Sequence, residues 1–454
     1  MQRFYRTMSE KIKSISKNIM IVLLLLSAGV LTWLNWFSDP PQIAGDSDSG
    51  FTRLVGALLG QASERQEPSA YSEHEEYAFT LSAVCPASAV VNTRDAFYHF
   101  AERQDVEALF DRASFVFATA LDTARSGKIL TAEDWRSRLY GPSLLFRFPG
   151  EMPLYYFAIS LGASQNADMD YMVSELLLDF SEDAVQLIAK TVEGDIYAYD
   201  TDVRGMNVQS FCVGMEPVKA QFACQNAYAV NRVPDETVIG TDSLAVPQLS
   251  VSPALTDFAA AESERMINTI LDSFGFNTYS VNSYIESDST RVYVEETHTL
   301  RITPDGTLVF DNGAQDELKP MSGLDMQVRT QNIAQGALIV EQAVLPYLGD
   351  ASVFLFRQYH DELSGNYIVV FSAVYNGMKI DLPGGYLARF EFRGTQLVKA
   401  YVNLTTFSCS EISDILLPSI YAAAAAGYGT PAVVFEARYS IRSGVAKAAW
   451  YYGN

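Results

Sequence analysis

The sequence has few basic residues. Its 454 residues include 32 Lys and Arg against 54 Asp and Glu, so the formal net charge is −22. A surface of this sign repels the phosphates of nucleic acids and the headgroups of anionic lipids. Binding to DNA or RNA is therefore not expected.

Residues that commonly carry catalysis are also sparse. The four histidines are far apart, and none has a second histidine three or four residues away, as zinc sites often do. Neither a Gly-x-Ser-x-Gly elbow nor a Walker loop is present. Asp168 and Asp170 are interpreted as loop acids rather than a catalytic pair. We expect no enzyme, no cofactor, no metal ion and no small-molecule substrate.

Cysteine is rare, and the four cysteines have no Cys-x-x-Cys spacing. Cys212 and Cys224 lie twelve residues apart around the turn signal Gly-Met-Glu-Pro. A disulfide that closes a hairpin between them is one alternative, and two buried free thiols are the other.

Residues 19–36 (IMIVLLLLSAGVLTWLNW) form an apolar run of eighteen residues without a charge. As a helix it is about 27 Å long, enough for the hydrocarbon core of a bilayer. The basic tail before it predicts a cytoplasmic N-terminus and an exported remainder. We therefore expect a tail at 1–18 and a single transmembrane helix at 19–37, with Trp33 and Trp36 as interfacial anchors. The alternative is a cleaved signal peptide, although the run exceeds the usual ~7–15 residues of such a peptide.

Small side chains gather in one part of this predicted helix. Ala28, Gly29 and Thr32 would let another membrane helix approach closely, and Asn35 adds a polar group near the outer interface. These four residues are candidates for contact with a partner's membrane helix. The alternative is that small residues are common in any membrane helix.

The remaining sequence alternates helical and strand patterns, with 48% hydrophobic residues. An acidic stalk is expected at 38–76 and an α+β domain at 77–245, closed by the Ser- and Pro-rich segment 244–253. Thr93 is the expected N-cap of a helix that carries Ala96, Phe97, Phe100 and Ala101, and Thr131 opens another helix. The other elements expected in this domain are a helix at 106–125 and strands at 143–148, 171–180, 184–191 and 195–199.

Two further domains are expected, at 250–320 and 325–454. Each begins with a helix that leads into an antiparallel meander, so the predicted class is α+β with a repeated helix-plus-meander unit. The expected helices are 256–274, 330–345 and 420–426. The expected strands are 291–302, 307–310, 353–359, 367–375, 386–392, 396–404, 433–441 and 446–452.

Several strings together resemble the YycH family of membrane-anchored regulators. The basic tail and apolar helix at 11–36 match in order, and residues 144–153 (LLFRFPGEMP) are similar to a strand and Phe-Pro turn of the first domain. Residues 293–310 resemble the family's central hairpin. Residues 371–392 and the ending ARYSIRSGVAKAAWYY resemble the C-terminal region shared with the YycI family. The acidic stalk, the alanine run at 422–426 and the four cysteines depart from that pattern.

The resemblance implies a function that the residues alone do not give. It implies a non-enzymatic regulator, anchored in the cell membrane of a Gram-positive bacterium with its bulk outside, that contacts a two-component sensor histidine kinase and a YycI-like partner to control the cell wall. The alternative is an anchored extracytoplasmic enzyme or a module that binds a cell-wall ligand.

Overall fold

The computed structural model describes residues 84–164, 169–255, 258, 260–313, 325–426 and 431–453. The chain divides into two compact units, 1–61 and 62–454, and every described residue belongs to the second. Within the described residues, no helix is both long and apolar enough to cross a membrane. The predicted tail, transmembrane helix and stalk lie outside the described residues.

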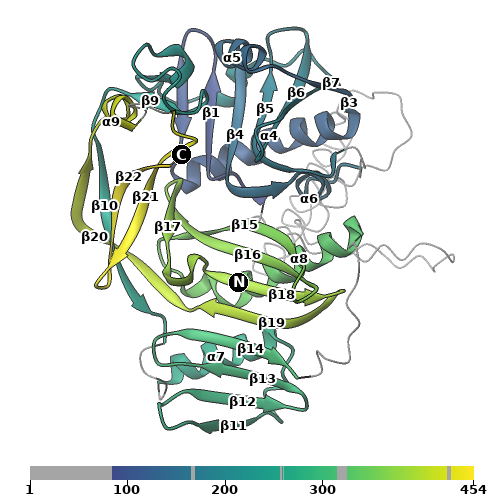
Figure 1. The fold of residues 1–454 in the computed structure, drawn as a ribbon, viewed down its shortest axis with the longest axis vertical. Helices are drawn as coiled ribbons and strands as arrows, with labels where there is room; N and C mark the ends of the chain where they lie inside the picture. Colours follow the sequence, from purple (N-terminus) through teal and green to yellow (C-terminus); the bar gives the residue numbers. More distant parts are fainter. Residues whose placement is uncertain are drawn as a thin grey trace, which may run out of the picture. The chain divides into compact units, whose positions relative to one another are not determined.

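The first part of the described chain builds a seven-stranded antiparallel sheet (Figure 1). Its strand order is β2-β1-β4-β5-β6-β7-β3. The strands are β1 Ser88–Asn92, β2 Phe97–Phe100, β3 Arg125–Ile129, β4 Ser143–Pro153, β5 Met172–Asp179, β6 Ala184–Thr191 and β7 Ile196–Arg204.

Helices cover both faces of this sheet, because successive strand side chains point to opposite faces and both sets are apolar. Helix α4 (Arg103–Thr123) packs on one face, where Phe117 stacks on Phe146 with ring centroids 4.5 Å apart. Helix α5 (Ala132–Tyr140) buries Trp135 on the other face. The predicted N-cap Thr131 is confirmed and forms a capping box with Asp134. A third helix, α6 (Leu154–Ser160), follows β4.

A short segment links this sheet to the next one. It contains the 3₁₀ helices η2 (Val208–Cys212) and η3 (Ala223–Gln225) and the strand pair β8 (Ala220–Phe222) and β9 (Val238–Gly240).

The rest of the described chain builds one thirteen-stranded sheet. Its main path is β11-β12-β13-β14-β19-β18-β16-β17-β21-β22-β10-β20, and β15 pairs with β16 beside it. The strand pairs of this sheet are antiparallel except β17 with β21, which is parallel. The strands are β10 Leu244–Pro253, β11 Asn282–Ile285, β12 Arg291–Glu295, β13 His298–Ile302, β14 Thr307–Asn312, β15 Ser352–Asp361, β16 Asn366–Tyr375, β17 Met378–Asp381, β18 Ala388–Arg393, β19 Gln396–Asn403, β20 Thr405–Leu416, β21 Val434–Arg442 and β22 Val445–Gly453.

Three helices accompany the large sheet. Each precedes a group of antiparallel strands in the chain, as the sequence predicted: α7 (Ala261–Ser273), α8 (Met326–Ala343) and α9 (Ser419–Ala426). Two short 3₁₀ turns, η5 (Leu345–Tyr347) and η6 (Pro383–Gly385), complete the elements. Helix α8 lies so close to the sheet that a Cβ on Gly336 would meet Phe390 at 3.1 Å. The architecture is therefore α+β and dominated by antiparallel sheets.

Two predictions for the domain expected at 77–245 were wrong. Thr93 caps no helix: it closes the β1–β2 hairpin, where its hydroxyl accepts a hydrogen bond from the Ala96 N–H at 3.1 Å. A threonine hydroxyl hydrogen-bonds to nearby backbone groups both at helix N-termini and in turns, so the sequence pattern did not distinguish a helix cap from a turn. The segment 244–253, expected to close a domain, is strand β10 of the large sheet.

Candidate functional site

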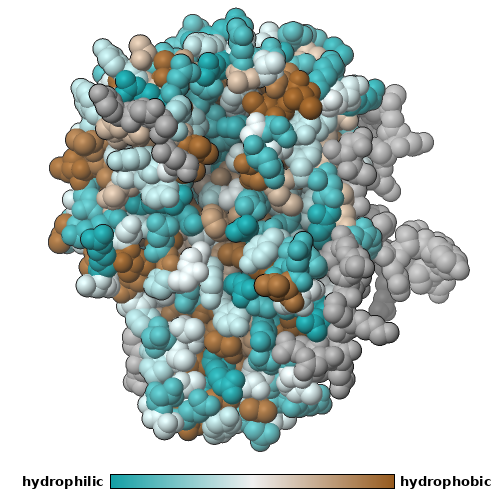
Figure 2. All heavy atoms as spheres, in the orientation of Figure 1, coloured by the Kyte–Doolittle hydropathy of each residue, from teal (hydrophilic) through white to brown (hydrophobic). Residues whose placement is uncertain are grey.

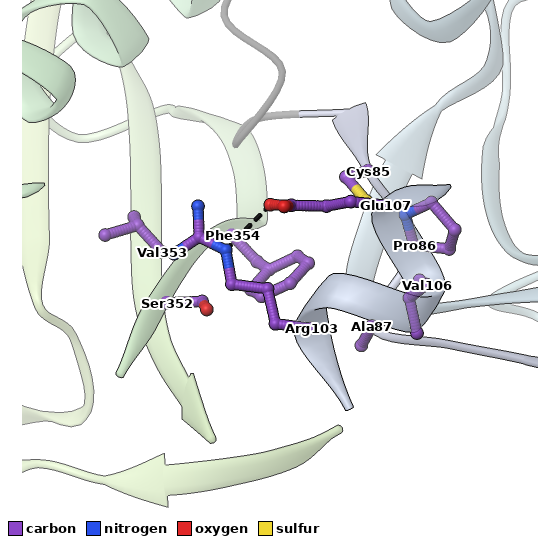
Figure 3. A pocket seen from close by; sticks show the side chains of 9 residues that line it. All are labelled: Cys85, Pro86, Ala87, Arg103, Val106, Glu107, Ser352, Val353 and Phe354. Carbon is purple, nitrogen blue, oxygen red and sulfur yellow. Dashed lines mark hydrogen bonds and ion pairs between the residues drawn. The ribbon is translucent and has the colours of Figure 1, made fainter. Parts of the chain in front are cut away.

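The seven-stranded sheet and the large sheet meet along strands β4 and β15. This junction is the candidate site, because a small pocket, a close backbone approach and several polar contacts lie along it. Helix α4 begins there, next to the segment 85–87 and the start of β15 (Figure 3). These elements line a small pocket, with the ion pair between Arg103 and Glu107 (2.7 Å) at its side. The pocket volume is about 20 Å³, room for one water molecule. It is far below the ~300 Å³ or more of a typical ligand pocket.

The two sheets approach each other closely where both strands bulge. The pairing of β4 with β5 shifts register between Arg147 and Met152, and the pairing of β15 with β16 shifts between Leu355 and Arg357. A β-bulge bends its strand locally. At the bend a Cβ on Gly150 would lie 2.1 Å from the Phe356 carbonyl oxygen. Only glycine permits this approach of the two backbones.

Polar side chains join the sheets at the other end of the junction. Arg329 of α8 pairs with Asp170, with 2.5 Å between Nη2 and Oδ2, and its guanidinium lies 4.9 Å from the Tyr155 ring centroid. The Tyr155 hydroxyl donates to Oε1 of Gln358 at 3.4 Å. Burial raises the pKa of Tyr155, so its hydroxyl stays protonated as a donor. Asp170, interpreted from the sequence as a loop acid, thus helps to hold the junction.

A second polar cluster is buried on the opposite face of the seven-stranded sheet. Lys190 of β6 pairs with Glu236 at 2.5 Å and with Glu175 at 3.3 Å, and the Trp135 indole N–H donates to Glu236 at 3.3 Å. Burial opposes ionisation of Glu236, but the Lys190 ammonium outweighs it and holds the pKa of Glu236 below its ordinary value. Burial and the neighbouring Glu236 raise the pKa of Glu175. Because Glu236 precedes β9, these contacts hold the segment that contains β8 and β9 against the seven-stranded sheet.

The residues singled out in the predicted membrane helix lie outside the described residues: Ala28, Gly29, Thr32, Trp33, Asn35 and Trp36. The hairpin disulfide is not formed. Cys212 and Cys224 are buried free thiols in different hydrophobic clusters, Cys212 on the α4 side and Cys224 on the α5 side. In the described part of the chain, no three His, Cys, Asp or Glu side chains gather as metal ligands would.

The junction residues were not identified from the sequence. The string Phe-Pro-Gly-Glu-Met-Pro at 148–153 does contain a signal, since Gly between two prolines marks a bend in a strand. Nothing in that string indicates that the bend meets Phe356, more than two hundred residues later.

Comparisons with known proteins bear on the fold. No protein-family model matches the chain, and no curated protein matches it. The fold is similar to the crystal structure of YycH from Bacillus subtilis, with a TM-score of 0.51 and 9% identity over 82% of this chain and 95% of that chain. An uncharacterised protein from Eubacterium rectale aligns over 46% of this chain and 76% of its own, with 8% identity and a TM-score of 0.28. At 9% identity the likeness to YycH concerns the fold.

Proposed function

We propose that the chain is a membrane-anchored, non-enzymatic regulator of a two-component sensor histidine kinase that controls cell-wall homeostasis. The observation that carries this proposal is the YycH-like fold, which extends over 82% of the chain. The order of basic tail and apolar run at 11–36 supports an anchor, with residues 38–454 on the outer side of the membrane. A YycI-like protein is the second partner.

Such a regulator acts by binding two states of the kinase with different affinity. A difference of a few kcal/mol shifts the population of a two-state protein substantially. The closely packed junction supports this role, because it holds the two sheets in a fixed relative position. A partner that binds one sheet therefore finds the other sheet at a defined place. The small residues Ala28 and Gly29 would add contacts with a partner's helix within the bilayer.

The proposal is tested in cells that carry a reporter of the kinase's response regulator. Deleting the chain should change reporter output, and the full chain should restore it. Replacing Gly29 with Ile and Ala28 with Leu together should reduce the restored output, because larger side chains prevent close helix packing. The control replaces Leu23 and Leu24 with Ile, which keeps the size of the side chains.

Two results would count against this function. If deletion of the chain leaves reporter output unchanged, the chain does not regulate the kinase. A change in cell-wall composition at constant reporter output would favour the anchored enzyme or wall-binding module instead.

A further inference from the structure

The free edges of the two sheets differ in how they are protected. An exposed edge strand presents unpaired N–H and C=O groups, which can pair with another chain. Proteins commonly protect such an edge with charged side chains, by keeping the strand short, or by covering it with another segment. Strand β3 carries Arg125 and Lys128, which pair with Asp202 and Asp200. Strand β11, at one end of the large sheet, has only four residues, and β15 lies against β4 at the junction. The other end of the large sheet is β20, with twelve residues.

One half of β20 is covered and the other half is open. Its Phe407 N–H donates to the Leu348 carbonyl at 2.9 Å, and its Cys409 N–H donates to the Asp350 carboxylate at 2.7 Å. Past Cys409 the strand bulges: Leu249 pairs with Cys409 but Pro247 pairs with Ser413. A regular edge resumes at Ser413, and no described strand pairs with β20 on this outer side.

The open half of β20 carries apolar side chains that face water. Ile415 is 77% exposed, and Leu417, the first residue after the strand, is 65% exposed. Ile412, in the bulge, is 62% exposed. In Figure 2 hydrophobic surface gathers along the left margin, where Figure 1 places β20 and α9. Contiguous exposed apolar residues of this kind mark interaction sites.

The charged side chains of the two strands at this edge all have one sign. Residues 241–255 and 405–426, which include β10, β20 and α9, contain Asp242, Glu411 and Asp414 and no Lys or Arg. Two copies of this edge would therefore repel each other, whereas a strand with basic residues would be attracted. The complementary occupant is a different chain with positive charge.

We propose that the edge of β20 from Ser413 to Leu416 binds an extended segment of a partner protein, which adds to the large sheet as a further strand. Main-chain hydrogen bonds would supply affinity, and alternate side chains would supply specificity. The segment has apolar residues at alternate positions, beside Ile415 and Leu417, and Lys or Arg near Glu411. The site goes beyond the proposed function and does not depend on a kinase as the partner.

The test measures binding of a peptide to the full-length protein in detergent micelles. The probe is a fluorescein-labelled peptide that repeats Val-Lys-Val-Thr three times, followed by fluorescence anisotropy. Ile415→Lys should weaken its binding by about tenfold or more, because it removes an apolar contact and places like charges together. Ile129→Lys is the matched control, since Ile129 is 71% exposed on the edge strand β3, and it should change binding less than about twofold.

A second peptide separates strand addition from attraction by charge alone. Methylating the backbone nitrogens of alternate valines removes hydrogen-bond donors and keeps the charge, so it should also weaken binding by about tenfold. Equal affinity of the two peptides, equal effects of Ile415→Lys and Ile129→Lys, or no binding of the unmodified peptide would overturn the proposal. A dimer in sedimentation that Ile415→Lys abolishes would overturn it in favour of a second copy of this chain.

Discussion

Replacing Gly150 with Ala should lower the free energy of unfolding by about 3 kcal/mol, the upper end of the range for an overpacked site. The added methyl carbon would lie 2.1 Å from the carbonyl oxygen of Phe356 and 2.6 Å from its carbonyl carbon. Both are backbone atoms of a bulged strand, so no side-chain rotation relieves the clash. The two strands must move apart, and the contacts along the junction weaken with them.

Urea unfolding of the full-length protein, followed by tryptophan fluorescence, measures this change. Gly240→Ala is the matched control, because a Cβ there meets the Lys219 carbonyl oxygen at 3.8 Å, an ordinary contact. It should alter the free energy of unfolding by less than about 0.5 kcal/mol. Equal effects at the two positions would show that the close approach at the junction does not exist.

Replacing Glu236 with Gln should lower the free energy of unfolding by about 3 kcal/mol at neutral pH. The change removes one of the two carboxylates around Lys190, whose ammonium then stays buried with Glu175 alone. Breaking a buried ion pair from one side is costly because the remaining charge loses its compensation. The exposed pair of Arg125 and Asp202 is the control, and Asp202→Asn should cost less than about 1 kcal/mol.

The pH dependence of this effect follows from the pKa of Glu236, which the fold lowers. A carboxyl whose pKa is lower in the folded state adds stability above its unfolded pKa and loses it as pH falls through the folded value. The difference between the original protein and Glu236→Gln should therefore shrink in acid, measured as the separation of their urea midpoints from pH 7 to pH 3. A separation that stays constant over this range would contradict an ionised Glu236.

Local sequence signals predicted much of the secondary structure. Strand β6 was predicted with both boundaries correct, because Glu193-Gly194 marks the hairpin after it. The turn implied between the expected strands 291–302 and 307–310 also forms, at Pro304-Asp305-Gly306, with Gly306 at φ 86°. The expected strand 291–302 is instead the two strands β12 and β13, which turn at Glu296 with φ 51°. Positive φ is uncommon for a residue other than glycine, so the sequence did not indicate a turn at this position.

Pairing between distant segments was not predictable in the same way. Strand β10 contains Pro247, which argues against a strand, but this proline sits where the register shifts at a bulge. Strand β20 has few buried side chains, so it lacks the apolar alternation by which strands are recognised. The junction depends on Gly150 meeting Phe356 and Arg329 meeting Asp170, and neither pair leaves a mark in the local pattern.

The measurement that tests the central claim most directly is the autophosphorylation rate of the sensor kinase in proteoliposomes, with and without the full-length chain. A regulator that favours one kinase state must change this rate, and a kinase reconstituted with a membrane-anchored protein of unrelated fold is the control. We predict a change in rate that grows with the amount of chain and saturates. A rate that stays the same at every amount of the chain would contradict the account.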